Sequence, residues 1–135
     1  MPQFGKSSLE QLATCDPRLQ VLFELVVQKV DCKVICGHRS NEQQALELAQ
    51  GSSTLGPGMS KHNRTPSLAV DVVPYFAVAP HIRWDDVKTF SRFVGYVEGV
   101  ASVLGIRLRV GLDWDGDWEW RDQKLHDLPH FELVT

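Results

Sequence analysis

The sequence lacks the features that mark several classes of protein. Its 135 residues carry 14 lysines and arginines against 17 aspartates and glutamates, so no basic surface for nucleic acid is expected. The longest apolar stretch, residues 21–27, is interrupted by Glu24 and is too short to cross a bilayer. The residues after Met1 also lack the apolar segment of a secretory signal. We therefore expect a protein without nucleic-acid binding or membrane insertion, made in the cytoplasm without a signal peptide.

Cysteines are few and odd in number. The chain has Cys15, Cys32 and Cys36, which excludes a full disulfide framework. Cys32 and Cys36 could form half of a thiolate metal site, but a second cysteine pair is missing. We expect reduced and mostly buried core thiols.

Hydrophobic periodicity and capping residues predict helices and strands in irregular alternation. Helices are predicted from Ser7 or Ser8 through Ala13, after the Asp16 cap to about Lys29, from Ser40 to Gly51, and from Asp85 or Asp86 through Leu104. Strands are predicted at residues 33–36, 68–74, 106–110 and 130–134. The absence of a regular strand–helix–strand repeat favours the α+β class, with a small, mostly antiparallel sheet, helices packed against it, and a single domain over residues 1–135.

Asp71 is the anomaly among the predicted strands. It lies within the apolar run 68–74, where an unpaired buried carboxylate costs on the order of several kcal/mol. Such a residue needs a cation, a set of hydrogen-bond donors or a metal. With His62 and His130 it supplies an imidazole–carboxylate–imidazole ligand set that leaves one coordination position open for water, the arrangement of a hydrolytic zinc site.

The C-terminal ligand is chosen by chain geometry. His126 and His130 are four residues apart, as in a helical metal-binding pair, but Pro129 disfavours a helix there. In an extended strand the two residues are roughly 13 Å apart, so only one can bind the ion. His130 opens the predicted strand, and Asp127 on the preceding turn is the candidate general base. Taken singly, each of these residues is more simply a surface or capping residue, and only their combination favours a metal site.

These residues resemble a known family. Ser60-Lys61-His62, the strand ending Ala69-Val70-Asp71, and Asp127-x-x-His130 are similar to motifs of the zinc D-alanyl-D-alanine carboxypeptidases and L-alanyl-D-glutamate endopeptidases, and most of all to endolysins of tailed phages. The resemblance runs from about Phe4 to Val134. It implies a Hedgehog/DD-peptidase-like fold.

The resemblance also implies roles for individual residues. It assigns His62, Asp71 and His130 as zinc ligands, Asp127 as the base, and Arg39 as an arginine that faces the substrate. Gln43 and Ser60 are further substrate-binding candidates, although each is as easily a capping residue. The implied activity is hydrolysis of a peptidoglycan stem peptide, most simply its L-alanyl-D-glutamate bond, by a monomer that reaches the cell wall after release from the host cytoplasm.

Two alternatives stay open at this point. The same fold could act as a D-alanyl-D-alanine carboxypeptidase, or the domain could be a non-catalytic cell-wall binding module with a structural zinc. Asp127 argues against the second, because a structural site would have a fourth ligand instead of a base. One departure from the family is the longer loop between His62 and Asp71, in which Ser67 stands at the usual glycine position.

The segment 113–120 combines four acidic residues with three tryptophans. Its glycine and glutamate do not follow EF-hand spacing, so calcium is not favoured there. We expect the loop to cover the active-site groove, with Trp114 as the tryptophan that faces the substrate.

Overall fold

The computed structural model describes residues 1–119, 121 and 127–135. Within this part of the chain, the α-helices are α1 (Lys6–Leu12), α2 (Pro17–Lys29), α3 (Asn41–Ala49) and α4 (Val87–Leu104), with one 3-10 turn, η1 (Lys61–Asn63). The strands are β1 (Cys32–Cys36), β2 (Ala69–Pro74), β3 (Leu108–Val110) and β4 (His130–Leu133). They form one antiparallel sheet in the order β1-β2-β4-β3. The predicted α+β class is confirmed.

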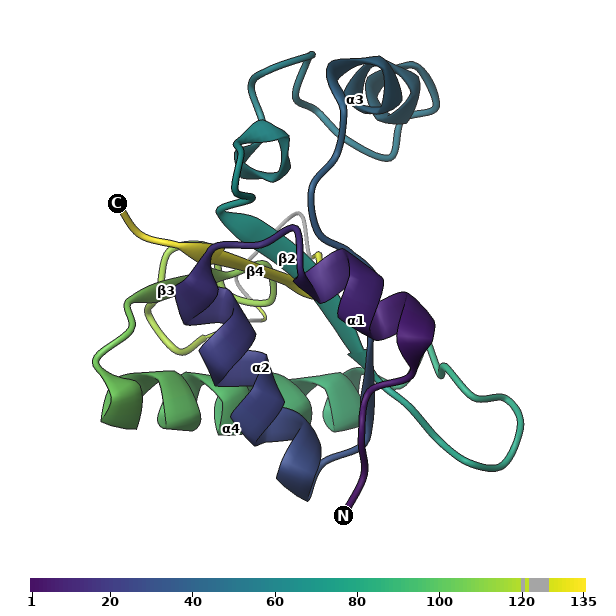
Figure 1. The fold of residues 1–135 in the computed structure, drawn as a ribbon, viewed down its shortest axis with the longest axis vertical. Helices are drawn as coiled ribbons and strands as arrows, with labels where there is room; N and C mark the ends of the chain where they lie inside the picture. Colours follow the sequence, from purple (N-terminus) through teal and green to yellow (C-terminus); the bar gives the residue numbers. More distant parts are fainter. Residues whose placement is uncertain (120, 122–126) are drawn as a thin grey trace.

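The helices are distributed unequally around the sheet. Figure 1 shows α4 along one side of the molecule, with α2 crossing it, while α3 stands at the opposite end. Phe131 of β4 is fully buried where these elements meet, with its ring centroid 5.2 Å from that of Phe23 and 6.1 Å from that of Phe93. The core therefore lies between the sheet and the α2–α4 pair. No helix in the described residues is long and apolar enough to cross a membrane.

Capping residues bound α2 and α4 as predicted. The Asp16 carboxylate accepts a hydrogen bond from the backbone N–H of Arg18 at the start of α2, and Asp86 accepts one from Thr89 at the start of α4. Gly105 ends α4 in the left-handed conformation, with φ of 73°, which a residue with a side chain adopts at a cost.

Two predicted boundaries are wrong. Helix α1 begins after Gly5 rather than after Ser7 or Ser8, because the Ser8 hydroxyl is buried and instead accepts a hydrogen bond from the backbone N–H of Val34 in β1. Strand β3 is shorter than the predicted 106–110, because the backbone N–H of Ile106 donates to the carbonyl of Ala101 and thereby closes the last turn of α4.

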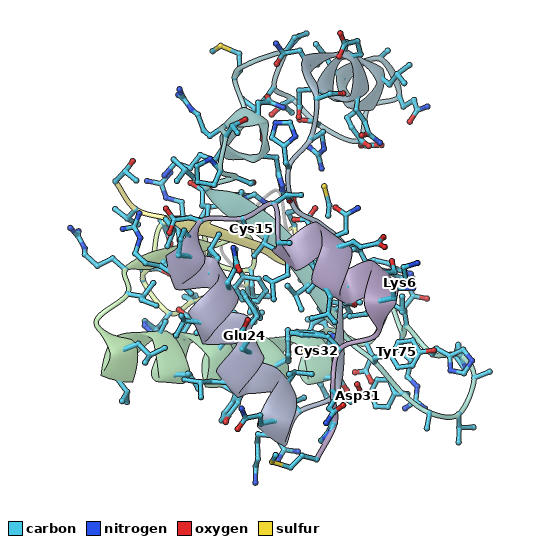
Figure 2. The ribbon with its side chains drawn as sticks, in the orientation of Figure 1. Lys6, Cys15, Glu24, Asp31, Cys32 and Tyr75 are labelled. Carbon is cyan, nitrogen blue, oxygen red and sulfur yellow. The ribbon has the colours of Figure 1, made fainter. Side chains whose placement is uncertain are left out.

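The cysteines are free thiols, as predicted. Figure 2 shows Cys15 between α1 and α2, and Cys32 at the start of β1. Burial raises the pKa of both thiols to about 12, so they are protonated and unreactive at neutral pH. Cys36 differs, because it is only half-buried and lies next to the site described below.

Candidate metal centre and groove

Three neighbouring strands place polar side chains in one row of the sheet. Asp71 of β2 pairs with His130 of β4, and on its other side it pairs with Cys36 of β1. The second pairing follows a register shift in β1 between Val34 and Cys36. Residues directly opposite one another in an antiparallel sheet share a face, so the three side chains lie together. This face is the one turned away from the apolar core formed by Val70 and Val72.

His62 reaches the same place from η1. The Ser60 hydroxyl caps this turn by accepting from the backbone N–H of His62, and the Asn63 side chain accepts from the N–H of Ser60 in return. The His62 ring is 2% exposed, and its Nδ1 lies 2.7 Å from the carbonyl oxygen of Gly37. Because a carbonyl can only accept, Nδ1 carries the proton and Nε2 has its lone pair free.

The Nε2 atom of His62 is a buried polar atom that needs a partner. It lies 3.3 Å from Oδ1 of Asp71, but no hydrogen bond with acceptable geometry reaches it from the described residues. A buried, unsatisfied nitrogen is costly unless a ligand completes it. A metal ion in front of Nε2 would do so.

His130 shows the same division of its two nitrogens. Its Nε2 lies 2.8 Å from Oε1 of Glu132, so this N–H donates to the carboxylate. Its Nδ1 is thereby left with a lone pair, and it lies 3.2 Å from the same Asp71 oxygen that faces His62. Metal-binding histidines commonly donate their outer N–H to a carboxylate or a carbonyl in this way.

Asp71 lies at a separation from each of the two histidine nitrogens that suits a small divalent cation. In a tetrahedral site with bonds of about 2.0–2.1 Å, neighbouring donors are about 3.3 Å apart. Asp71 Oδ1 lies at 3.3 Å from the His62 nitrogen and 3.2 Å from the His130 nitrogen, while the two imidazole centroids are 5.2 Å apart. Ligand atoms of Asp71, Asp127 and His130 lie within 4.8 Å of one another, as do those of Cys36, His62 and Asp71. Asp71 is therefore the residue common to both groups.

Cys36 is less suited to be a ligand than its position suggests. Its sulfur lies 3.9 Å from Nδ1 of His62, the nitrogen that already donates to Gly37, and not beside Nε2. The sulfur also donates to the Gly37 carbonyl at 3.6 Å. Cys36 therefore packs behind the imidazole ring.

Electrostatics at the site favour a cation. Burial alone lowers the pKa of each histidine, but the Asp71 carboxylate, together with Cys36 at His62 and Glu132 at His130, more than reverses this effect, so the pKa of His62 rises to about 10 and that of His130 to about 9. The two histidines in turn hold the pKa of Asp71 well below its ordinary value despite burial. Positive charge is thus stabilised at this point, and a metal ion can replace the two protons.

Asp127 lies beside this cluster on the turn that leads into β4. Its Oδ2 is 3.9 Å from Nδ1 of His130, and its side chain is 48% exposed, so it can contact both the ligands and the solvent. Burial of the carboxyl group, followed by the negative charge of Asp71, raises its pKa, which suits a proton acceptor working near neutral pH. A divalent cation nearby would lower the pKa of Asp127.

A groove of about 660 Å³ opens over these residues. It runs from α3 and the loop after it to β3 and β4, and Trp114 lines it with its ring centroid 5.2 Å from that of His130. Of the residues predicted from the sequence, the groove contains Arg39, Ser60, His62, Asp71, Trp114, Asp127 and His130. The predicted site residues are therefore brought together, with one exception.

The exception is Gln43, which is exposed on α3 and is absent from the groove lining. Its neighbour Gln44 is fully buried instead, and its side-chain oxygen accepts a hydrogen bond from Nη1 of Arg39 at 2.9 Å. Arg39 is 13% exposed at its side chain, with Nη2 3.7 Å from Oδ2 of Asp71. The arginine is thus fixed in orientation by α3 and by a metal-ligand candidate.

Sequence reasoning missed four residues at this site. Glu132 contacts His130, Lys61 lies 3.3 Å from Glu132, Arg109 lines the groove from β3, and Gln44 orients Arg39. Glu132 could have been found, because it is two residues after His130 in a strand and so shares its face. The positions of the other three at the site depend on how separate elements pack, which a local sequence pattern does not predict.

The acidic loop does bring three carboxylates together. Asp113, Asp115 and Asp117 have ligand atoms within 4.8 Å of one another, and Asp115 and Asp117 are exposed. Backbone N–H groups of the same loop donate to them, including that of Trp118 to Asp113 at 2.7 Å, so the loop's own turns account for the arrangement. His126, the alternative to His130, and Trp120, the last tryptophan of the segment 113–120, lie outside the described residues.

The chain is similar to known proteins over nearly its whole length. A family model described as phage L-alanyl-D-glutamate peptidase matches residues 1–134. The L-alanyl-D-glutamate peptidase of Escherichia phage T5 is 35% identical over 138 residues, which cover 98% of this chain and 98% of the phage protein. Among solved structures, the L-Ala D-Glu endopeptidase ChiX of Serratia marcescens matches with a TM-score of 0.75 and 27% identity, over 98% of this chain and 90% of that one.

Proposed function

Since the chain belongs to the phage L-alanyl-D-glutamate peptidase family, we propose that its groove hydrolyses the L-alanyl-D-glutamate bond of peptidoglycan stem peptides with a zinc ion held by His62, Asp71 and His130. As an endolysin it would act on the cell wall after release from the cytoplasm. The observation that carries the zinc assignment is the orientation of the two imidazoles. Each donates its outer N–H to a fixed acceptor and turns its other nitrogen toward Asp71.

Zinc suits this donor set better than other common ions. Two imidazole nitrogens and one carboxylate oxygen form a frequent catalytic zinc site, which keeps a fourth position for water or substrate. Bound here, zinc would polarise the scissile carbonyl and lower the pKa of water to about 7. Calcium or magnesium would require more oxygen ligands than these residues provide.

The remaining chemistry belongs to side chains of the groove. Asp127 accepts the proton of the attacking water at its exposed carboxylate and later donates a proton to the leaving amine of D-glutamate. Arg39, held by Gln44, offers its guanidinium to a substrate carboxylate or to the developing oxyanion. Trp114 beside His130 covers the reacting centre and limits the access of bulk water.

A cleavage assay on purified peptidoglycan tests this function. We expect new amino termini of D-glutamate, their loss when the protein is treated with a zinc chelator, and their return when zinc is added back. Protein carrying Asp127→Asn, which removes the proposed base with little change in side-chain volume, is the matched control and should release product about 10²- to 10⁴-fold more slowly.

The products also distinguish the competing functions. Release of free D-alanine would support a carboxypeptidase on the same fold and contradict the endopeptidase. Full activity after complete removal of metal would overturn the zinc assignment. Absence of any product from zinc-loaded protein would overturn the catalytic proposal as a whole.

A further inference from the structure

The groove has an arginine at each edge of the sheet. Arg39 follows β1 and Arg109 lies in β3, and these two strands are the outer ones in the order β1-β2-β4-β3. The inner strands β2 and β4 carry Asp71 and His130. Both arginines line the groove, so guanidinium groups flank the metal-ligand candidates on either side.

Arg109 has few contacts of its own. Its side chain is 53% exposed, and its one ion pair within the described residues joins Nη1 to Oε2 of Glu132 at 3.9 Å, too long for a hydrogen bond. Arg39, in contrast, is 13% exposed and donates to Gln44. The guanidinium donors of Arg109 are therefore available to a ligand in the groove.

Glu132 does not need Arg109 as its partner. Its carboxylate already accepts from Nε2 of His130 at 2.8 Å and lies 3.3 Å from the ammonium of Lys61. Lys61 is fixed in turn by a hydrogen bond to the carbonyl of Leu133. Since the charge of Glu132 is balanced by these contacts, the positive charge of Arg109 remains for another anion.

The net charge of the groove also favours an anionic ligand. Its lining contains three permanent cations, Arg39, Lys61 and Arg109, against four carboxylates, Glu47, Asp71, Asp127 and Glu132. A divalent metal adds two positive charges, which leaves the loaded groove with one excess positive charge. A substrate that carries carboxylates is attracted by such a groove.

We propose that Arg109 is a second carboxylate-binding residue for the stem peptide, acting from the opposite edge of the groove to Arg39. This inference rests on the proposed peptidase function. A planar guanidinium can hold a carboxylate through two parallel hydrogen bonds, and peptidoglycan stem peptides carry carboxylates at D-glutamate and at later residues. Two arginines that read two carboxylates on either side of the metal fix the direction in which the peptide lies.

The test uses zinc-loaded protein and a synthetic stem peptide with two free carboxylates, compared with two derivatives in which one or the other is a carboxamide. The variants are Arg109→Gln, Arg109→Lys, and the control Arg107→Gln. Arg107 is exposed and borders a different surface pocket, so its replacement removes the same charge outside the groove. The readouts are kcat, KM and bound zinc.

We expect each of the two amidations to lower kcat/KM of the unmodified protein by about tenfold to a hundredfold, the usual effect of losing a hydrogen bond to a charged group. Arg109→Gln should lower kcat/KM on the unmodified peptide by a similar factor, mainly through KM; it should no longer respond to one of the two amidations and should still respond to the other. Arg109→Lys should keep part of the preference for the carboxylate peptide over its carboxamide derivative, because lysine retains the positive charge but lacks the two parallel donors of a guanidinium. Arg107→Gln should behave like the unmodified protein.

Two results would overturn the inference alone: a response of Arg109→Gln to both amidations that equals that of the unmodified protein, or a loss of zinc in this variant that accounts for its lower activity. Failure of the unmodified zinc-loaded protein to cleave any of the peptides would overturn the proposed function, and this inference with it.

Discussion

Asp71 is the residue that contacts both the two histidines and Arg39. One carboxylate oxygen faces His62 and His130 at 3.3 and 3.2 Å, and the other faces Arg39 at 3.7 Å. Such an environment explains how a carboxylate with 8% exposure is tolerated inside an apolar strand, because an unpaired one would cost on the order of several kcal/mol. The local oddity in the sequence therefore marks the centre of the site.

Asp127 and His130 are three residues apart but should fail in different ways when replaced. Asp127→Asn should bind zinc normally and lose about 10²- to 10⁴-fold in kcat, because it removes a proton acceptor and no ligand. His130→Ala should lose both zinc and activity, because it removes a donor nitrogen. Metal analysis and kinetics on the same preparations make the comparison. Equal zinc content in the two variants would contradict the roles assigned here.

Glu132 should act on metal binding through His130. Glu132→Gln can still accept the hydrogen bond from Nε2 but loses the charge that holds this imidazole, so we expect zinc affinity to fall by about tenfold to a hundredfold. Competition with a coloured chelator measures the affinity without reference to activity. The control is Glu24→Gln, which removes the same charge from the exposed face of α2. An affinity that matches that of the control would show that His130 needs no carboxylate behind it.

At the scale of the elements, Gly111 determines where Asp127 lies. Its carbonyl accepts from the backbone N–H of Asp127 at 3.1 Å, and its own N–H donates to the carbonyl of His130 at 2.9 Å. A Cβ added to Gly111 would overlap the Asp127 carbonyl and approach the Cβ of Asp127 to 2.9 Å. The turn that carries Asp127 can pack against this strand end only because residue 111 has no side chain.

Gly111→Ala should therefore displace Asp127 and lower kcat by about a hundredfold, since a shift of about 1 Å at a reacting group has effects of that order. It should also lower the free energy of unfolding by about 1–3 kcal/mol through overpacking. Gly99→Ala in α4 is the control, because a Cβ there meets nothing within 4 Å and alanine favours a helix. Unchanged kcat in Gly111→Ala would mean that the turn relaxes without moving the carboxylate.

Helix starts could be predicted from local sequence, whereas features set by contacts between distant segments could not. Caps at Asp16 and Asp86 and the apolar stripes behind them are local patterns, and both helices were predicted with their starts. The start of β3 was not, because the backbone N–H of Ile106 donates to the carbonyl of Ala101 in the last turn of α4, although the strand pattern begins at Ile106. Predicting the position of Cys36 beside Asp71 would have required the register shift in β1, which is set by the pairing of two distant segments.

At the scale of the whole molecule, one face of the sheet packs in the apolar core and the other face carries the candidate site. The apolar face of β2 and β4 packs on α2 and α4, whereas the other face carries the ligand row under the groove. The residues of the proposed ligand set could be picked out from the sequence, because Asp71 is a carboxylate in an apolar strand and the two histidines complete a zinc-type donor set with it. The residues that orient the ligands could not, with the exception of Glu132, because Gln44, Lys61 and Arg109 are ordinary polar residues until the fold brings them together.

Glu98 of α4 gives the whole fold a dependence on pH that is separate from the metal site. Partial burial, with a smaller contribution from the negative charge of Asp113, raises the pKa of Glu98 from its ordinary value of 4.5 to about 7. The folded protein thus prefers the neutral carboxyl group. This preference has its full effect below about pH 4.5, where the group is protonated in both states, and it is lost as the pH rises through about 7, where folding must hold a charged carboxylate.

Glu98→Gln keeps the shape of the neutral acid and cannot ionise. We expect it to match the unmodified protein at pH 4 and to be more stable at pH 8 by about 1–2 kcal/mol, a value reduced from the full shift because the side chain is only partly buried. Urea unfolding of metal-free protein at both pH values measures the difference. Glu24→Gln, on the exposed face of α2, should show no such change between the two pH values. A stability difference for Glu98→Gln that is the same at pH 4 and pH 8 would mean that this carboxyl group titrates alike in the folded and unfolded chains.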